Sequence, residues 1–190
     1  MSLRIVGGFL KGRRIEFPST LSFRPSSEML RAALFNICQF NLENTHVLDL
    51  FSGSGALGIE AMSRGASFCL FVEKDRTSAL YIRKNLEKLQ LAENSKVLSG
   101  DVFSLVRSIQ GKFHLVLLDP PYDFSKEHPE KIASLLSQLV ERKLLHEKAL
   151  LFFEEGFSEE HLRHPPLFTS FAHLATRRYG GSLLHYYFLS

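Results

Sequence analysis

Val47-Leu48-Asp49-Leu50-Phe51-Ser52-Gly53-Ser54-Gly55-Ala56-Leu57-Gly58 is the stretch that decides the fold of this chain. It opens with a mostly apolar run at 47–51, which is typical of a strand buried on both faces of a parallel sheet. Gly53, Gly55 and Gly58 then reproduce the spacing G-x-G-x-x-G, and a helix is expected over 56–64. A strand, a glycine loop and a helix in this order predict the ligand-binding start of a doubly wound α/β sheet.

The same alternation of strand and helix continues toward the C-terminus. Further strands are expected at 68–72, 96–98, 113–118 and 149–153, and further helices at 76–91, 102–109 and 129–141. The pattern changes at the end of the chain, where the β-prone runs 167–176 and 182–189 flank Tyr179-Gly180-Gly181, a typical hairpin turn. We therefore predict an α/β fold with a mostly parallel sheet and an antiparallel C-terminal hairpin.

The N-terminal segment differs from the rest in both pattern and charge. Short β-prone runs at 3–7 and 13–16 predict a hairpin or an extended arm, and a helix capped by Ser26 or Ser27 is expected to reach about Gln39. Residues 1–36 hold six cations and two anions, so their net charge is +4, whereas the whole chain carries +3. This asymmetry favours an arm that contacts a polyanion, with an ordinary solvated surface as the alternative.

Length and composition limit the remaining possibilities. A chain of 190 residues with 45% hydrophobic and 23% charged residues predicts one globular domain: a short basic N-terminal extension, 1–25, and a catalytic core, 26–190. No apolar run approaches the roughly 20 residues that span a bilayer, and no signal peptide is recognisable. Two cysteines are too few for a disulfide framework, so we expect a cytoplasmic protein with no membrane contact.

Two acidic residues distinguish between the possible cofactors. Glu73 ends the next expected strand, 20 residues after Gly53, where an acid accepts hydrogen bonds from ribose hydroxyls. Asp49 lies directly before the glycine loop, where it would repel the pyrophosphate of a dinucleotide. S-adenosylmethionine has no phosphate and carries an ammonium and a sulfonium. The sequence therefore favours S-adenosylmethionine over NAD.

Asp119-Pro120-Pro121-Tyr122 follows the strand expected at 113–118. Ligands of open α/β sheets bind beyond the carboxyl ends of the strands, so this segment and the glycine loop should face one crevice. The Asp119 carboxylate and a neighbouring carbonyl together can accept both hydrogens of an exocyclic base amine, and Tyr122 can stack on the base. These residues predict methylation of an aromatic amine, with Asp119 also able to take the released proton.

The chain resembles the bacterial RsmD-type small-subunit ribosomal RNA guanine-N2 methyltransferases along nearly its whole length. The resemblance rests on several motifs: Arg4-Ile-Val-Gly-Gly8, Arg24-Pro-Ser-Ser-Glu28, Arg31-Ala-Ala-Leu-Phe-Asn36, Asp49 to Gly58, Glu60-Ala-Met-Ser-Arg-Gly65, Val72-Glu-Lys-Asp75 and Asp119-Pro-Pro-Tyr122. It implies a Rossmann-like class I methyltransferase fold with a seven-stranded sheet. It also implies S-adenosylmethionine as the methyl donor and a guanine of 16S rRNA as the acceptor, within a partly assembled small-subunit ribonucleoprotein.

The resemblance also assigns roles to individual residues. It implies cofactor contacts at Asp49, Gly53, Gly55, Glu73 and, next to the adenine, Asp101; the amine site is implied at Asp119, Pro120 and Tyr122. From the charge pattern we expect rRNA phosphate contacts at Lys11, Arg13, Arg14 and Arg24, and this function requires no metal.

Other functions stay open at this point. Asp119 to Tyr122 alone would also suit an adenine-N6 DNA methyltransferase, and the fold alone would suit a non-catalytic RNA-binding assembly factor. An NAD dehydrogenase is the least favoured alternative. The modified nucleotide, the assembly state of the RNA substrate and the oligomeric state do not follow from the sequence.

Overall fold

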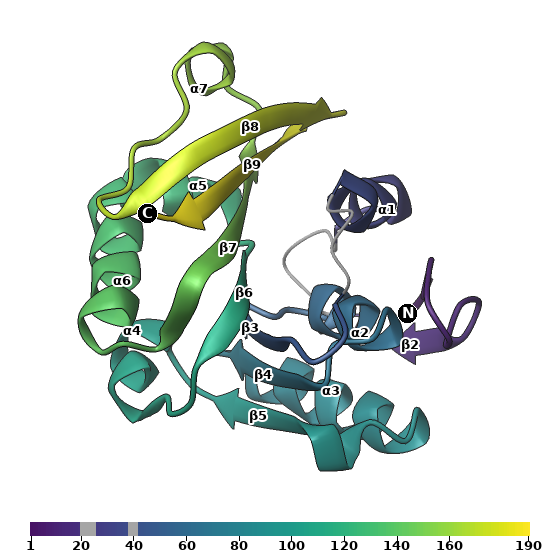
Figure 1. The fold of residues 1–190 in the computed structure, drawn as a ribbon. Helices are drawn as coiled ribbons and strands as arrows, with labels where there is room; N and C mark the ends of the chain where they lie inside the picture. Colours follow the sequence, from purple (N-terminus) through teal and green to yellow (C-terminus); the bar gives the residue numbers. More distant parts are fainter. Residues whose placement is uncertain (20–25, 38–41) are drawn as a thin grey trace.

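The computed structural model describes residues 1–19, 26–37 and 42–190 (Figure 1). Its centre is a seven-stranded sheet in the order β5-β4-β3-β6-β7-β9-β8. The parallel strands are β3 (His46–Leu50), β4 (Phe68–Glu73), β5 (Ser95–Ser99), β6 (Phe113–Leu118) and β7 (Leu145–Gly156), and β8 (Phe171–Tyr179) and β9 (Ser182–Leu189) form the antiparallel hairpin. The predicted mostly parallel sheet with a terminal hairpin is therefore confirmed.

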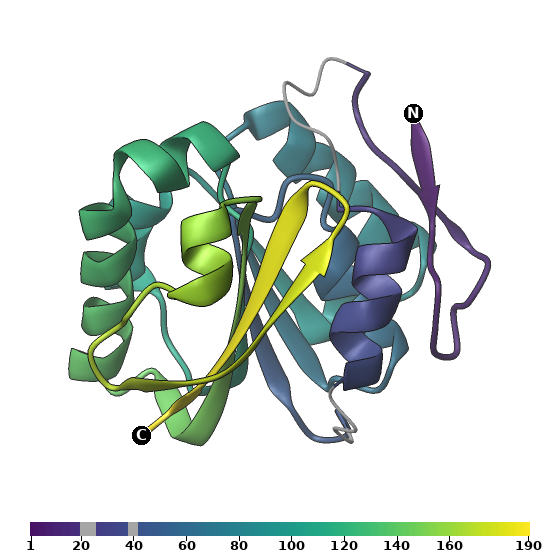
Figure 2. The ribbon, with the colours of Figure 1, turned by 90° about the horizontal axis from the view of Figure 1, so that it is seen from above.

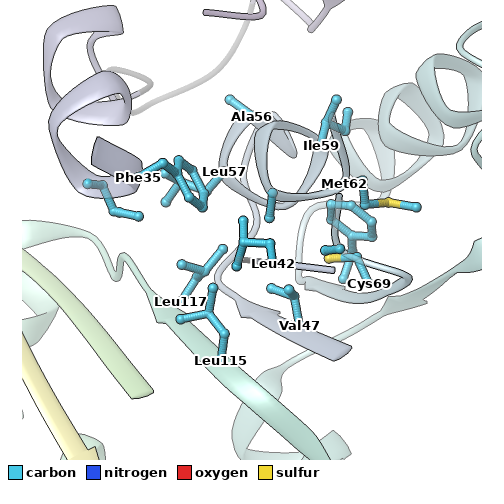
Figure 3. Close-up of a cluster of buried hydrophobic side chains, with 14 of the residues drawn as sticks. Phe35, Leu42, Val47, Ala56, Leu57, Ile59, Met62, Cys69, Leu115 and Leu117 are labelled. Atoms are coloured by element: carbon cyan, nitrogen blue, oxygen red, sulfur yellow. The ribbon is translucent and has the colours of Figure 1, made fainter. Parts of the chain in front are cut away.

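Helices cover both faces of this sheet. One hydrophobic cluster joins α1 (Glu28–Ile37), α2 (Ala56–Ser63) and α3 (Arg76–Lys88) to one face, and Figure 3 shows part of it around Leu57 and Leu117. A second cluster joins α4 (Val102–Leu105) and α6 (Pro129–Glu141) to the other face. Strand residues alternate between the two clusters, so both faces of β3 and β6 are buried, as their continuous apolar runs predict. Within the described residues, no helix is long and apolar enough to cross a membrane.

Some boundaries differ from the predictions. The helix predicted over 102–109 consists of α4 and a 3-10 turn, Val106–Ser108, and the strand predicted at 149–153 is the longer β7. The short helix α5 (Tyr122–Glu127) lies in a segment that had no predicted element, and α7 (Glu159–Arg163) is a short surface helix of the kind that the sequence suggests there. Elements of five or six residues are too short to show a hydrophobic period, and tertiary contacts determine them instead.

The N-terminal segment forms a hairpin of β1 (Ser2–Arg4) and β2 (Arg14–Glu16) that packs against α2 and α3. Its turn is attached to the last residue of α2, because Ser63 accepts the backbone N–H groups of Phe9 and Leu10. Strand β2 exchanges two hydrogen bonds with the side chain of Asn85 in α3. These contacts fix the hairpin on the helical layer, away from the sheet.

A buried ion-pair cluster holds the hairpin, α1 and α2 together. Glu60 in α2 is fully buried and pairs with Arg31 of α1 at 3.3 Å and with Arg64 at 2.9 Å. The Glu60 carboxylate also accepts the backbone N–H of Val6, and Arg31 donates to the carbonyl of Arg4. Burial lowers the pKa of Arg31, and the charge of Glu60 opposes that shift. Removing Glu60 would leave the Arg31 charge buried and uncompensated.

Candidate active site

The glycine loop connects β3 to α2 at the carboxyl edge of the sheet. Gly53 and Gly55 have φ values of 55° and 76°, in the left-handed region that favours glycine. Gly58 is required for a different reason: a Cβ atom there would lie 2.3 Å from the Phe71 ring and 2.8 Å from the Asp49 carboxylate. The motif therefore combines a tight turn with close packing of α2 on β3 and β4.

Asp49 lies beneath this loop in β3 and is almost fully buried. Its Oδ2 accepts the backbone N–H of Gly58 at 2.9 Å. Burial raises the pKa of Asp49 to about 8, and the charge of Glu73 acts in the same direction. A cationic ligand at this position would remove that penalty, because an adjacent positive charge favours the ionised carboxylate.

Glu73 ends β4, the parallel neighbour of β3, and is also buried. Its carboxylate accepts the backbone N–H groups of Gly53 at 2.6 Å and of Asp75 at 2.7 Å. Burial raises the pKa of Glu73 as well. A carboxylate has about four acceptor positions, so Glu73 can still accept a hydrogen bond from a ligand hydroxyl. Glu73 and Gly53 thus form one structural unit, although they are 20 residues apart.

Asp101 follows β5, one strand further along the same edge. Its Oδ1 caps α4 by accepting the N–H of Phe103 at 2.9 Å, and its Oδ2 forms a 3.4 Å ion pair with Lys74, whose side chain is exposed. The backbone of Gly100 donates to the carbonyl of Glu73, so the ends of β4 and β5 are linked. Three adjacent strands therefore supply one acidic residue each near their carboxyl ends: Asp49 in β3, Glu73 at the end of β4 and Asp101 just after β5.

Asp119 follows β6, on the other side of β3. Its Oδ2 accepts a hydrogen bond from the Ser26 hydroxyl at 2.7 Å. Burial raises the pKa of Asp119 well above its usual range, with further contributions from the charges of Glu154 and Asp49. Ser27, and not Ser26, caps α1 by accepting the N–H of Leu30. The two serines that sequence patterns treat as alternatives therefore have separate functions.

Tyr122 begins α5 and has 44% of its surface exposed. Its ring lies against Gly156, where a Cβ atom would be 3.2 Å from the ring. Its hydroxyl donates to Oε1 of Glu154 at 2.9 Å and lies 2.7 Å from the Ser182 hydroxyl. Glu154 and Ser182 therefore fix the position of the Tyr122 hydroxyl. The exposed part of the ring remains available to stack on a planar ligand.

Ser26 and Glu154 are the site residues that sequence reasoning did not find. Glu154 lies one residue beyond the strand predicted at 149–153 and is 4% exposed. An acidic residue directly after a buried strand was the available signal, and it is the same signal that identified Glu73. For Ser26 the sequence offered only a capping pattern.

The basic residues of the N-terminal hairpin are not part of this constellation. Lys11, Arg13 and Arg14 are exposed, and the hairpin turn is attached at the last residue of α2, whereas the glycine loop precedes the first. Figure 2 shows this turn and the β8–β9 turn pointing to opposite edges of the sheet. Arg24, the fourth residue of this predicted group, lies outside the described residues. Phosphate contact by these residues stays a prediction.

Comparison with known proteins gives the family. A family model described as Conserved hypothetical protein 95 matches residues 3–188. The chain belongs to this family. Haemophilus influenzae ribosomal RNA small subunit methyltransferase D is 32% identical over 155 residues, which cover 80% of this chain and 78% of that protein. YlbH of Bacillus subtilis, named as a candidate rRNA methyltransferase, is also 32% identical over 155 residues, covering 80% of this chain and 82% of the relative. The resemblance to RsmD-type enzymes is therefore confirmed.

A solved structure extends the likeness to the whole chain. The Escherichia coli protein yhhF, described as a candidate methyltransferase, superposes with a TM-score of 0.85 at 27% identity and covers 100% of this chain and 99% of that one. The Rossmann-like methyltransferase fold is thus confirmed. Among residues 1–19, 26–37 and 42–190, no group of three His, Cys, Asp or Glu side chains has an arrangement that could hold a metal ion.

Proposed function

We propose that this protein transfers a methyl group from S-adenosylmethionine to the exocyclic 2-amino group of a guanine in 16S rRNA. The supporting observation is that Asp49, Glu73 and Asp119 are brought to one edge of the sheet without cationic partners. Among the described residues, no lysine or arginine forms an ion pair with any of these three carboxylates. A site built from uncompensated carboxylates favours a cationic ligand and an amine.

The residues present fit S-adenosylmethionine. Asp49 would face its positively charged amino-acid part, Glu73 would accept the ribose hydroxyls, and Asp101 would lie toward the adenine. Gly53 and Gly55 let the backbone approach the ligand closely. When bound, this cofactor supplies an electrophilic methyl group on a sulfonium that leaves as a neutral thioether.

The amine site would work mainly by positioning. The Asp119 carboxylate and the Pro120 carbonyl would accept the two amine hydrogens, which directs the nitrogen lone pair toward the methyl group. The exposed part of the Tyr122 ring would stack on the base, and a guanine in a helix would have to leave its stack to reach this edge. The raised pKa of Asp119 makes it a stronger base for the proton that the nitrogen must lose.

The partner in this proposal is 16S rRNA within a small-subunit ribonucleoprotein, and the place of action is the cytoplasm. The test is incubation of the protein and labelled S-adenosylmethionine with small subunits from a strain that lacks the enzyme, followed by mass analysis of nucleosides. We expect N2-methylguanosine in 16S rRNA. Label in N6-methyladenine of duplex DNA would favour the DNA methyltransferase instead, and cofactor binding without any product would favour the assembly factor.

A further inference from the structure

Glu154 contains a buried acceptor that the proposed mechanism does not yet use. Its side chain is on β7, 4% exposed, and its Oε1 accepts the Tyr122 hydroxyl. Its Oε2 is buried and has no hydrogen-bond partner among the described residues. Buried polar atoms are nearly always paired, because an unpaired one costs free energy. An unpaired carboxylate oxygen beside the amine site is therefore a position where a proton can bind.

A line of polar groups leads from this position to solvent. The carboxyl groups of Asp119 and Glu154 lie within hydrogen-bonding reach of each other, and the charge of Glu154 also raises the pKa of Asp119. On the other side of Glu154, the Tyr122 hydroxyl contacts Ser182, the first residue of β9. From the amine site to the start of β9 in the C-terminal hairpin, the polar groups therefore follow in the order Asp119, Glu154, Tyr122 and Ser182.

We propose that Glu154 is a positioning residue that acts through Asp119: it takes over the proton that Asp119 removes from the amine, and the Tyr122 and Ser182 hydroxyls pass that proton to solvent. This inference rests on the proposed function. In each turnover an N–C bond forms and the C–S bond breaks, with its electron pair going to sulfur. The nitrogen then loses one proton to the Asp119 carboxylate, and transfer to Glu154 Oε2 restores that carboxylate. Rotation of the Glu154 carboxyl group then presents the proton to the Tyr122 hydroxyl, which turns toward Ser182, accepts this proton and donates its own to the Ser182 hydroxyl.

The arrangement explains why two carboxyl groups lie together without a cation. The titratable groups that face Asp119 are Glu154 of β7, Asp49 of β3 and Tyr122 of α5. Two adjacent carboxyl groups do not readily stay ionised together, so the ionised pair that begins a turnover favours taking up one proton and sharing it. Removal of the Glu154 charge should therefore lower the pKa of Asp119 and make it a weaker base.

The test uses full-length Glu154→Gln and Tyr122→Phe variants, with Tyr187→Phe as the control. Tyr187 is a buried tyrosine on the same strand as Ser182, but its hydroxyl bonds to the Pro166 carbonyl, away from the site. Single-turnover methyl transfer to small subunits is measured from pH 5 to 9, together with the affinity for S-adenosylhomocysteine. Tyr122→Phe keeps the stacking ring and removes only the relay hydroxyl.

We expect Glu154→Gln to slow methyl transfer at least about tenfold and to move the acid limb of the pH profile to lower pH, with S-adenosylhomocysteine affinity unchanged. Tyr122→Phe should slow transfer severalfold, and Tyr187→Phe should behave as the wild type. A second readout needs no turnover: infrared titration of carboxyl groups in the free protein, with the Asp119 band assigned from Asp119→Asn. Its midpoint should be lower in Glu154→Gln.

The relay would be overturned, with the proposed function intact, if Glu154→Gln turned over at the wild-type rate with the same acid limb, or if the Asp119 infrared midpoint did not move. If the wild-type protein transfers no methyl group to RNA at any pH, the proposed function fails and the relay fails with it. A rate loss without a shift of the acid limb would reduce Glu154 to a structural residue and likewise contradict the proposal.

Discussion

Two regions of this molecule place acidic side chains in or near the interior, and only one of the two supplies them with arginines. In the helical layer, Glu60 is matched by Arg31 and Arg64 and by a backbone N–H. At the carboxyl edge of the sheet, Asp49 accepts the backbone N–H of Gly58, Asp119 accepts the Ser26 hydroxyl, and both have raised pKa values. The first region shows how this chain neutralises a charge for stability. The second leaves its carboxyl groups without arginines or lysines, which suits a site whose ligand brings the positive charge.

The two regions are in contact through Arg31. Its Nε donates to the backbone carbonyl of Ser26 at 3.3 Å, and the Ser26 hydroxyl donates to Asp119. The ion-pair cluster therefore positions a group of the amine site, although none of its charges lies there. Substitutions at the carboxyl edge should therefore change the rate of methyl transfer, whereas substitutions in the ion-pair cluster should change the free energy of unfolding.

The largest effect is expected at Asp119. Asp119→Ala should reduce methyl transfer about 1000-fold, because both an amine acceptor and the proton acceptor are removed. Affinity for S-adenosylhomocysteine should stay within about twofold, since the cofactor residues follow other strands. Steady-state kinetics and calorimetry measure the two quantities. Asp123→Ala removes an exposed carboxylate from the first turn of α5 and is the matched control. Turnover near the wild-type rate in Asp119→Ala would remove Asp119 from the mechanism.

Next comes the ion-pair cluster. Glu60→Gln keeps the shape of the side chain but leaves the fully buried Arg31 without its counter-charge, so the free energy of unfolding should fall by about 3–5 kcal/mol. Denaturant unfolding measures the change. Arg163→Met, which breaks the exposed pair with Glu159, should cost less than about 1 kcal/mol. Equal decreases in the two variants would contradict the difference between buried and exposed pairs.

A smaller but diagnostic effect concerns Asp49. Its pKa of about 8 means that the carboxyl group is mostly protonated at pH 7 in the free protein. Because a cationic ligand favours the ionised form, binding of S-adenosylmethionine should release about one proton at pH 7 and progressively fewer as pH rises above 8. Calorimetry in buffers of different ionisation enthalpy counts the protons. Asp49→Asn should abolish the release and Asp123→Asn should not; no proton release from the wild type would contradict a cation at Asp49.

The sequence predicted the edge of the sheet better than the contacts between distant segments. Gly53, Gly55 and Gly58 were recognisable as a loop because a left-handed turn and close helix packing leave few other residues possible. Glu73 was identified because it ends the strand after the glycine loop, and the carboxyl ends of neighbouring parallel strands lie at the same edge of a sheet. The hydrogen bond from Ser26 to Asp119 joins residues 93 positions apart, and no local sequence pattern indicates such a contact. The same applies to Arg31, which sequence patterns place in an amphipathic helix but which tertiary contacts bury completely.

The smallest effect is expected at the N-terminal hairpin, because its turn points away from the site. Lys11→Ala, Arg13→Ala and Arg14→Ala combined should weaken rRNA binding and reduce the slope of log affinity against log salt by at most about 3, one unit for each phosphate that is no longer neutralised. The rate at saturating small subunits should not change. A charge-matched control replaces the exposed Lys84, Lys96 and Lys112 with Ala. If both triple variants weaken binding equally, the hairpin contributes only to net charge. If the slope falls in the hairpin variant alone, the RNA extends about the length of a helix beyond the methylation site, and the basic segment acts as a remote anchor for it.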